Sequence, residues 1–175
     1  MHVASLHRYP IKSHGREQIS AVTLIEGQTM PWDRVWAVTH EATKFDAASP
    51  AWVSCRNIMI GSRTPGLAGI WAPLDDTTRQ VSLRHADLED ISFHPDDADD
   101  VVRFLTWVAP LCPPERGAPS GIVSVPGRGM TDSPLASVSI MNTASHADVA
   151  SKMDSPIELE LPSLLGFSDV RIERA

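Results

Sequence analysis

The stretch HVASLHRYPIKSHG, residues 2–15, sets the start of the fold. Its first half, HVASLHR, is a short run typical of a β-strand. Its second half, YPIKSHG, combines proline, serine and glycine, which end strands and form turns. Lys12 and Ser13 therefore stand side by side where a strand ends. An ammonium group and a hydroxyl in such a place can hold a phosphate, although a plain solvated turn is the commoner use of the same residues.

Short runs of the same kind fill the first half of the chain. Five more strands are expected, at ISAVTLI (19–25), RVWAVTH (34–40), LAGIWA (67–72), QVSLRH (80–85) and DISFH (90–94). The 14 prolines and 10 glycines of the chain supply the turns that many short strands need. No fixed period recurs, which argues against a solenoid or a propeller.

One helix is expected over residues 97–108, within the segment HPDDADDVVRFLTWVAP. Acidic residues at its start suit the positive end of the helix dipole, and Pro110 ends it. Val101, Leu105 and Val108 recur at helical spacing, and Phe104 widens the apolar stripe. We expect Val101, Leu105 and Val108 to be buried, with the helix closing one side or end of the strand-rich unit.

A connector rich in proline and glycine, LCPPERGAPSG, marks the expected boundary between a first unit, 1–117, and a second, 118–175. Beyond it we expect strands at GIVSVP (121–126) and ASVSIMN (136–142), a short helix over about 145–153, and last strands at SPIELEL (155–161) and DVRIER (169–174). The pattern predicts a β-rich α+β fold, with a small N-terminal β-barrel or sandwich and one or two helices.

The bulk composition limits the classes of function. The chain has 15 basic and 22 acidic residues and a net charge of −7, so general nucleic-acid binding is not expected. No run approaches the roughly 18 apolar residues of a membrane span. We therefore expect a soluble, cytoplasmic protein without membrane contact.

Cysteine and histidine spacing predicts no metal site. Cys55 and Cys112 form no CxxC pair, and the seven histidines show neither HxH nor HxxxH spacing. We expect both thiols to be free. Arg56 beside Cys55 can lower the pKa of that thiol, but an inert, half-buried thiol is the preferred interpretation. No GxSxG turn supports a serine nucleophile.

Arg34, in WDRVWAV, is a second candidate for anion binding. It opens a strand whose next residues are bulky and apolar. A guanidinium at a strand start can direct its planar set of donors into a pocket. The alternative is an edge arginine that pairs with Asp33.

The strand ending in YPIKS and the later DR.W pair together resemble the N-terminal β-barrel domain that precedes MOSC domains. MOSC denotes the C-terminal domain of molybdenum cofactor sulfurases. The segment GRGMTDSPLASVSIMNTASHADVASKM (127–153) is similar to the entry into the MOSC domain itself. The resemblance covers about residues 2–160. It implies that residues 118–175 are a partial or divergent MOSC segment, the start of a MOSC-type β-barrel.

The resemblance also implies a site. Lys12, Ser13 and Arg34 match the residues that contact the phosphate of molybdopterin, the molybdenum cofactor, in amidoxime-reducing members. Thr143 and Ser145 match a helix start that faces the cofactor, and a helix N-terminus suits an anion. The implied activities are a molybdenum-dependent oxidoreductase of N-hydroxylated compounds, served by a redox partner protein, or a sulfur carrier. Pyridoxal phosphate binding is a further property that the resemblance implies.

The sequence departs from the family in its last part. No R-x-R-x-N strand is present, and no cysteine follows Cys112, where the family has a thiolate that ligates molybdenum or carries sulfur. We therefore expect this chain alone to bind a phosphate-bearing pterin weakly or not at all, without turnover. The alternative is a non-catalytic β-barrel module that binds an anion or a partner. An apolar group is expected to pack on the barrel or to form a homodimer contact: Leu161, Leu164, Leu165 and Phe167.

Overall fold

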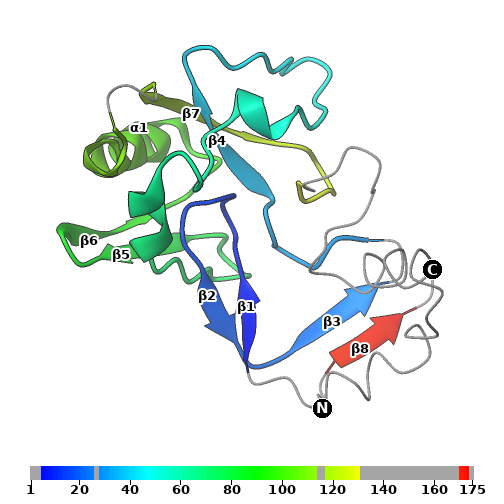
Figure 1. The fold of residues 1–175 in the computed structure, drawn as a ribbon. Coiled ribbons are helices and arrows are strands. Elements are labelled where there is room, and N and C mark those ends of the chain that lie inside the picture. The colour runs from blue at the N-terminus through cyan, green and yellow to red at the C-terminus, as the bar shows by residue number, and fades with distance from the viewer. Residues whose placement is uncertain (1–4, 26–27, 114–116, 131–169, 174–175) are drawn as a thin grey trace.

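A computed structural model describes residues 5–25, 28–113, 117–130 and 170–173 (Figure 1). The strands are β1 (Leu6–Arg8), β2 (Glu17–Ile19), β3 (Val22–Ile25), β4 (Trp36–His40), β5 (Val81–His85), β6 (Leu88–Phe93), β7 (Pro119–Ser124) and β8 (Val170–Glu173). One α-helix, α1 (Ala98–Val108), and three short 3-10 helices, Cys55–Asn57, Pro65–Gly69 and Ala109–Leu111, complete the described elements. The expected β-rich α+β class is confirmed.

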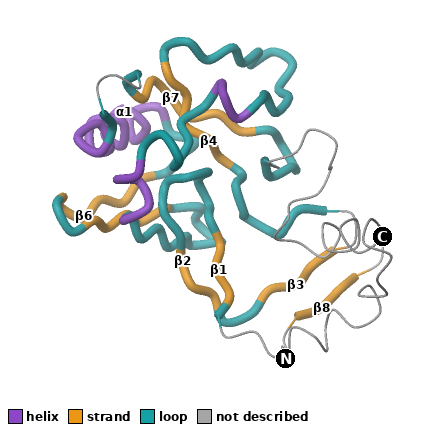
Figure 2. Tube along the Cα trace, viewed as in Figure 1, coloured by secondary structure: helices purple, strands orange, loops and turns teal. Residues whose placement is uncertain are grey.

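The strands form small ladders rather than one continuous sheet (Figure 2). The pairs β1–β2, β4–β7 and β5–β6 are antiparallel, and β3–β8 is parallel. Single bridges connect the ladders: Ile11 with Trp36, and Trp71 with both Arg16 and Arg84. The β1–β2 hairpin is thereby joined to β4 through Ile11 and to β5 through Trp71.

Most expected strands are confirmed, with two differences. The run 19–25 is divided between β2 and β3, which pair with different partners. The run 67–72 was wrongly expected to be a strand: Pro65–Gly69 is a 3-10 helix, and only Trp71 makes bridges. Pro65 at the first helical position presets the helical φ angle, and this local turn chemistry outweighs the apolar pattern.

The helix forms as expected, but its buried face is centred differently. The Asp97 side chain caps it by accepting a hydrogen bond from the Asp100 N–H at 3.0 Å. Phe104 and Val108 are fully buried, whereas Val101 and Leu105 are only half-buried. The Phe104 ring stacks on Phe93 of β6 with centroids 4.6 Å apart. This aromatic contact turns the helix so that Phe104, not Val101 or Leu105, lies at the centre of the interface.

The main hydrophobic core lies between α1, the β5–β6 hairpin and β4. Its buried members are Ile11, Trp36, Val38, Met59, Leu67, Ile70, Ala72, Leu74, Val81, Leu83, Phe93, Phe104 and Val108. A smaller cluster contains Ala37, Ile58 and Met130. Strand β4 contributes alternate residues to both clusters, because successive side chains of a strand point to opposite faces. It is therefore buried on both faces.

The second half of the chain is described only in part. The run DVRIER is confirmed as containing β8, and β7 confirms the strand expected at 121–126, beginning two residues earlier. The expected division at residue 117 stays a prediction; β7 lies beyond it and pairs with β4. The features expected within 136–161, and the apolar group of residues 161–167, lie outside the described residues. No helix in the described ranges is long and apolar enough to cross a membrane.

Candidate anion-binding site

The loop between β1 and β2 is a tight turn over residues 11–14. The His14 N–H donates to the Ile11 carbonyl at 3.1 Å, and Ser13 has a φ of +64°. Gly15 follows with a φ of +85°, and a Cβ there would lie 2.6 Å from the backbone oxygen of Ile70. Only glycine fits at position 15, whereas Ser13 adopts a left-handed conformation at an energetic cost. Such strained residues are concentrated at functional sites.

This loop lies beside the segment that leads into β4. The Lys12 N–H donates to the Trp36 carbonyl at 2.8 Å, and the Arg34 N–H donates to the Tyr9 carbonyl at 2.7 Å. The Trp36 N–H donates to the Pro10 carbonyl at 3.3 Å. These bonds bring the segments that carry Lys12, Ser13 and Arg34 side by side, although the segments are far apart in sequence.

Asp33 connects the two segments. Its carboxylate is 1% exposed. Oδ1 accepts the Tyr9 N–H at 2.9 Å, and Oδ2 accepts Nε–H of Arg34 at 2.8 Å. The ion pair that the sequence offered as an alternative is therefore present, and it fixes the Nε edge of the guanidinium against the loop. Asp33 is therefore a positioning residue. From the sequence alone, it was expected only as an ion-pair partner that would replace anion binding by Arg34.

The two cations of the site are largely removed from water. Lys12 is 7% exposed and Arg34 is 8% exposed. Lysine and arginine are rarely buried to this degree unless they are paired or hydrogen-bonded.

His14 is the residue of the loop that sequence reasoning missed. Its ring is fully buried and meets Phe104 of α1 edge-on, with centroids 5.9 Å apart. Nδ1 lies 2.7 Å from the Lys12 carbonyl oxygen, which can only accept, so Nδ1 carries the proton. Burial lowers the pKa of His14 to about 4, so the ring is neutral at pH 7. Among the described residues, Nε2 has no hydrogen-bond partner.

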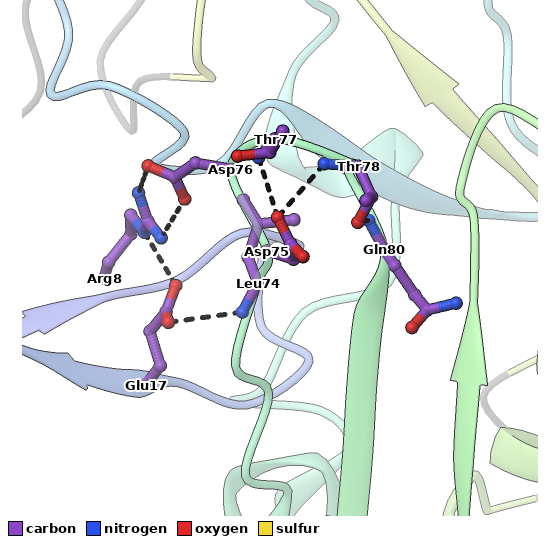
Figure 3. Close-up of polar contacts among 8 residues, drawn as sticks. All are labelled: Arg8, Glu17, Leu74, Asp75, Asp76, Thr77, Thr78 and Gln80. Carbon is purple, nitrogen blue, oxygen red and sulfur yellow. Dashed lines mark hydrogen bonds and ion pairs between the residues drawn. The ribbon is translucent and has the colours of Figure 1, made fainter.

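An ion network fixes the hairpin that carries this loop (Figure 3). Nε–H of Arg8 in β1 donates to Glu17 in β2 at 2.7 Å, and its two terminal nitrogens donate to Asp76 at 2.6 and 3.1 Å. The second oxygen of Glu17 accepts the Leu74 N–H at 3.2 Å. Asp75 stabilises the adjoining turn by accepting two backbone N–H groups, which lower the pKa of its carboxyl. The hairpin is thereby held to the segment before β5.

The remaining candidates lie elsewhere or outside the described ranges. Thr143 and Ser145 are outside them. Cys55 and Cys112 are free and half-buried. The thiol of Cys112 donates to the Val108 carbonyl at 3.5 Å, and burial raises its pKa, so it is a protonated thiol at pH 7. In the part of the chain that the structure describes, no group of three or more His, Cys, Asp or Glu side chains is arranged to hold a metal ion.

The comparison with known families addresses most of the N-terminal unit. The model of the MOSC N-terminal beta barrel domain matches residues 1–108. The chain belongs to this family. The matched range of the MOSC N-terminal barrel contains the β1–β2 loop, Arg34 and α1. Comparison with curated proteins and with solved structures gave no match.

Proposed function

We propose that this MOSC-family chain binds the phosphate of a molybdopterin-type cofactor through Lys12, Ser13 and Arg34. The observation that carries the proposal is the backbone pairing of residues 9–12 with residues 34–36. This pairing brings two distant sequence segments into contact, as a shared site would require. Membership of the MOSC family supports a molybdenum cofactor as the source of the phosphate.

The chemistry of the three side chains fits a phosphate dianion. Lys12 supplies a compact positive charge, and Arg34 supplies a planar set of donors suited to two phosphate oxygens. Ser13 supplies a hydroxyl from a left-handed turn position. When bound, the molybdenum cofactor supplies redox chemistry at its metal. Within the described residues, the chain fits the phosphate end of that group, and no side chain is assigned to the metal.

Two neighbours maintain the arrangement without touching the anion. The Asp33 carboxylate orients Arg34 and ties it to the Tyr9 N–H. The neutral imidazole of His14 holds the Lys12 carbonyl through Nδ1–H, which fixes the turn that presents Lys12 and Ser13. Preorganised donors of this kind lose little conformational freedom when an anion binds.

A second candidate is a non-catalytic barrel that binds an anion through the same loop. The state of Cys112 favours it. A molybdenum ligand or sulfur carrier must be a thiolate, and the half-buried Cys112 thiol has a raised pKa and donates to a carbonyl. The two candidates share the phosphate site and differ only in whether metal chemistry follows binding.

Calorimetric titration of the full chain with inorganic phosphate, and then with molybdenum cofactor released from a molybdoenzyme, tests the proposal. Lys12→Ala and Arg34→Ala are each expected to weaken binding about 10- to 100-fold, the range of one charge-assisted hydrogen bond. Lys44→Ala and Arg84→Ala, which change exposed cations, are the matched controls. Equal affinities in all four variants would refute the site. Molybdenum analysis and an amidoxime reduction assay then separate enzyme from binding module.

A further inference from the structure

A pocket of about 370 Å³ lies beside the entry to β4. It is lined by residues from segments 25–36 and 124–129, together with Arg79 and Asp96. Lys12, Ser13 and Arg34 do not line it. Its volume is within the range of small-molecule sites. It is therefore a cavity in its own right, and the inference drawn from it does not rest on the proposed function.

One wall of the pocket is a pair of stacked indoles. The ring centroids of Trp32 and Trp36 are 5.9 Å apart, and the ring planes are inclined to each other by 21°. Trp36 is 3% exposed, and its Nε1–H donates to Oδ1 of Asp96 at 3.1 Å. Oδ2 of Asp96 accepts from Arg79 at 2.8 Å. The inner indole is fixed by this chain of contacts, and it supports the half-buried ring of Trp32 at the pocket.

The backbone around the pocket is strained. Trp32 and Arg79 each have a φ of +61°, in the left-handed region. A bulky residue with positive φ is a true outlier, because its Cβ crowds the backbone. Here the Asp33 N–H closes the turn around Trp32 by donating to the Met30 carbonyl at 3.1 Å. Strain maintained by the surrounding structure is a feature of ligand-binding sites.

Among the described residues that line the pocket, positive charge is in excess: Arg79 and Arg128 against Asp96. The charge of Asp96 is neutralised by Arg79, so the remaining charge on the described lining is the guanidinium of Arg128. No described residue pairs with that guanidinium, whereas the backbone of Arg128 is fixed at both ends. Its N–H donates to the Val125 carbonyl at 3.2 Å, and its carbonyl accepts Nε1–H of Trp52 at 2.8 Å. A fixed backbone and a cation without a partner among the described residues suit the recognition of an anionic group.

We propose that this pocket binds a planar aromatic ligand that carries an acidic group. The ring lies against Trp32, because aromatic rings prefer offset-stacked or edge-to-face contacts with one another. The acidic group meets Arg128, whose planar guanidinium suits a carboxylate or a phosphate.

Two probes test the ring and the charge separately. The isotope-labelled full chain is titrated with naphthoate and with the neutral naphthamide, and binding is followed by NMR of the indole and backbone N–H groups. We expect saturable shifts at Trp32, Gly127 and Arg128. Naphthoate is expected to bind about two- to fivefold more tightly than naphthamide, the range of an exposed charge pair.

Variants that suit the local backbone identify the contacts. Trp32→Gly removes the ring and tolerates positive φ, so both probes should bind about three- to tenfold more weakly. Arg128→Gln removes the positive charge but keeps the backbone hydrogen bonds. This variant should therefore bind naphthoate and naphthamide with equal affinity. Arg84→Gln and Lys44→Ala, which change exposed cations outside the pocket, should leave both affinities unchanged.

Several results would overturn the proposal. They are an absence of saturable binding at millimolar probe, shifts confined to other parts of the chain, or unchanged affinity in a folded Trp32→Gly variant. If that variant does not fold, Trp32→Asn replaces it, because asparagine also adopts positive φ. Equal binding of naphthoate and naphthamide by the unaltered chain would refute the acidic group.

Discussion

Acid is expected to destabilise this protein through His14, well above the pH at which carboxylates titrate. In the folded chain the ring is fully buried and its pKa is about 4, against 6.5 for an ordinary histidine. Desolvation is the cause, because a buried imidazolium loses its hydration. The hydrogen bond to the Lys12 carbonyl acts in the opposite direction and only partly offsets it.

The sign of the effect follows from proton linkage. Between pH 6.5 and pH 4 the unfolded chain binds a proton at His14 and the folded chain does not, so stability falls as the pH falls through this window. For these two pKa values the loss between pH 7 and pH 5 is about 2 kcal/mol. The full loss at lower pH is about 3 kcal/mol.

Urea unfolding of the full chain at pH 7 and pH 5 measures this loss, with His14→Asn as the reference. Asparagine places an N–H donor close to the position of Nδ1 and does not titrate. The cavity that it leaves lowers stability at both pH values alike, so it cancels in the difference. We expect the unaltered chain to lose about 2 kcal/mol more than His14→Asn over this interval. The same loss in both proteins would show that the His14 ring is hydrated in the folded chain.

Two further predictions concern the hairpin and its turns. Gly15→Ala should destabilise the fold by more than Gly127→Ala. Both positions have positive φ, which costs alanine about 1–2 kcal/mol, but only at Gly15 would the Cβ meet a backbone oxygen, at 2.6 Å. Glu17→Gln should cost about 2–3 kcal/mol because it removes a buried charge from Arg8, whereas Asp76→Asn should cost about 1 kcal/mol or less because Asp76 is 54% exposed. Thermal unfolding checks each pair, and a reversed order within either pair would contradict the packing described.

The sequence predicts the elements better than their contacts. Runs such as QVSLRH and DISFH form strands because their pattern and their turns agree. LAGIWA does not, because Pro65 and the glycines near it favour a tight helix while still burying Leu67. In α1 the stripe is visible in the sequence, but the contact of Phe104 with Phe93 decides which residue lies at its centre.

The residues of the candidate site also fall into those that the sequence can predict and those that only the structure reveals. Lys12, Ser13 and Arg34 can be selected from sequence because their motif has recognisable chemistry. The roles of Asp33 and His14 cannot, since they depend on contacts with Tyr9 and with α1 that only the folded chain creates. Positive φ at Ser13 and Arg34 also leaves no trace in composition or periodicity. Tertiary structure, rather than any local pattern, determines which side chains hold the loop.

The parallel pairing of β3 with β8 has a consequence for how the chain folds as it is synthesised. Val22 pairs with Val170, so one edge of β3 lacks this partner until residue 170 has been translated. At about 10 residues per second the delay is on the order of 10 s, long compared with the microseconds in which hairpins such as β1–β2 and β5–β6 form. During that interval the N–H and C=O groups of β3 are open to pairing with other chains. Slow translation or a chaperone that covers β3 would therefore influence the yield of folded protein.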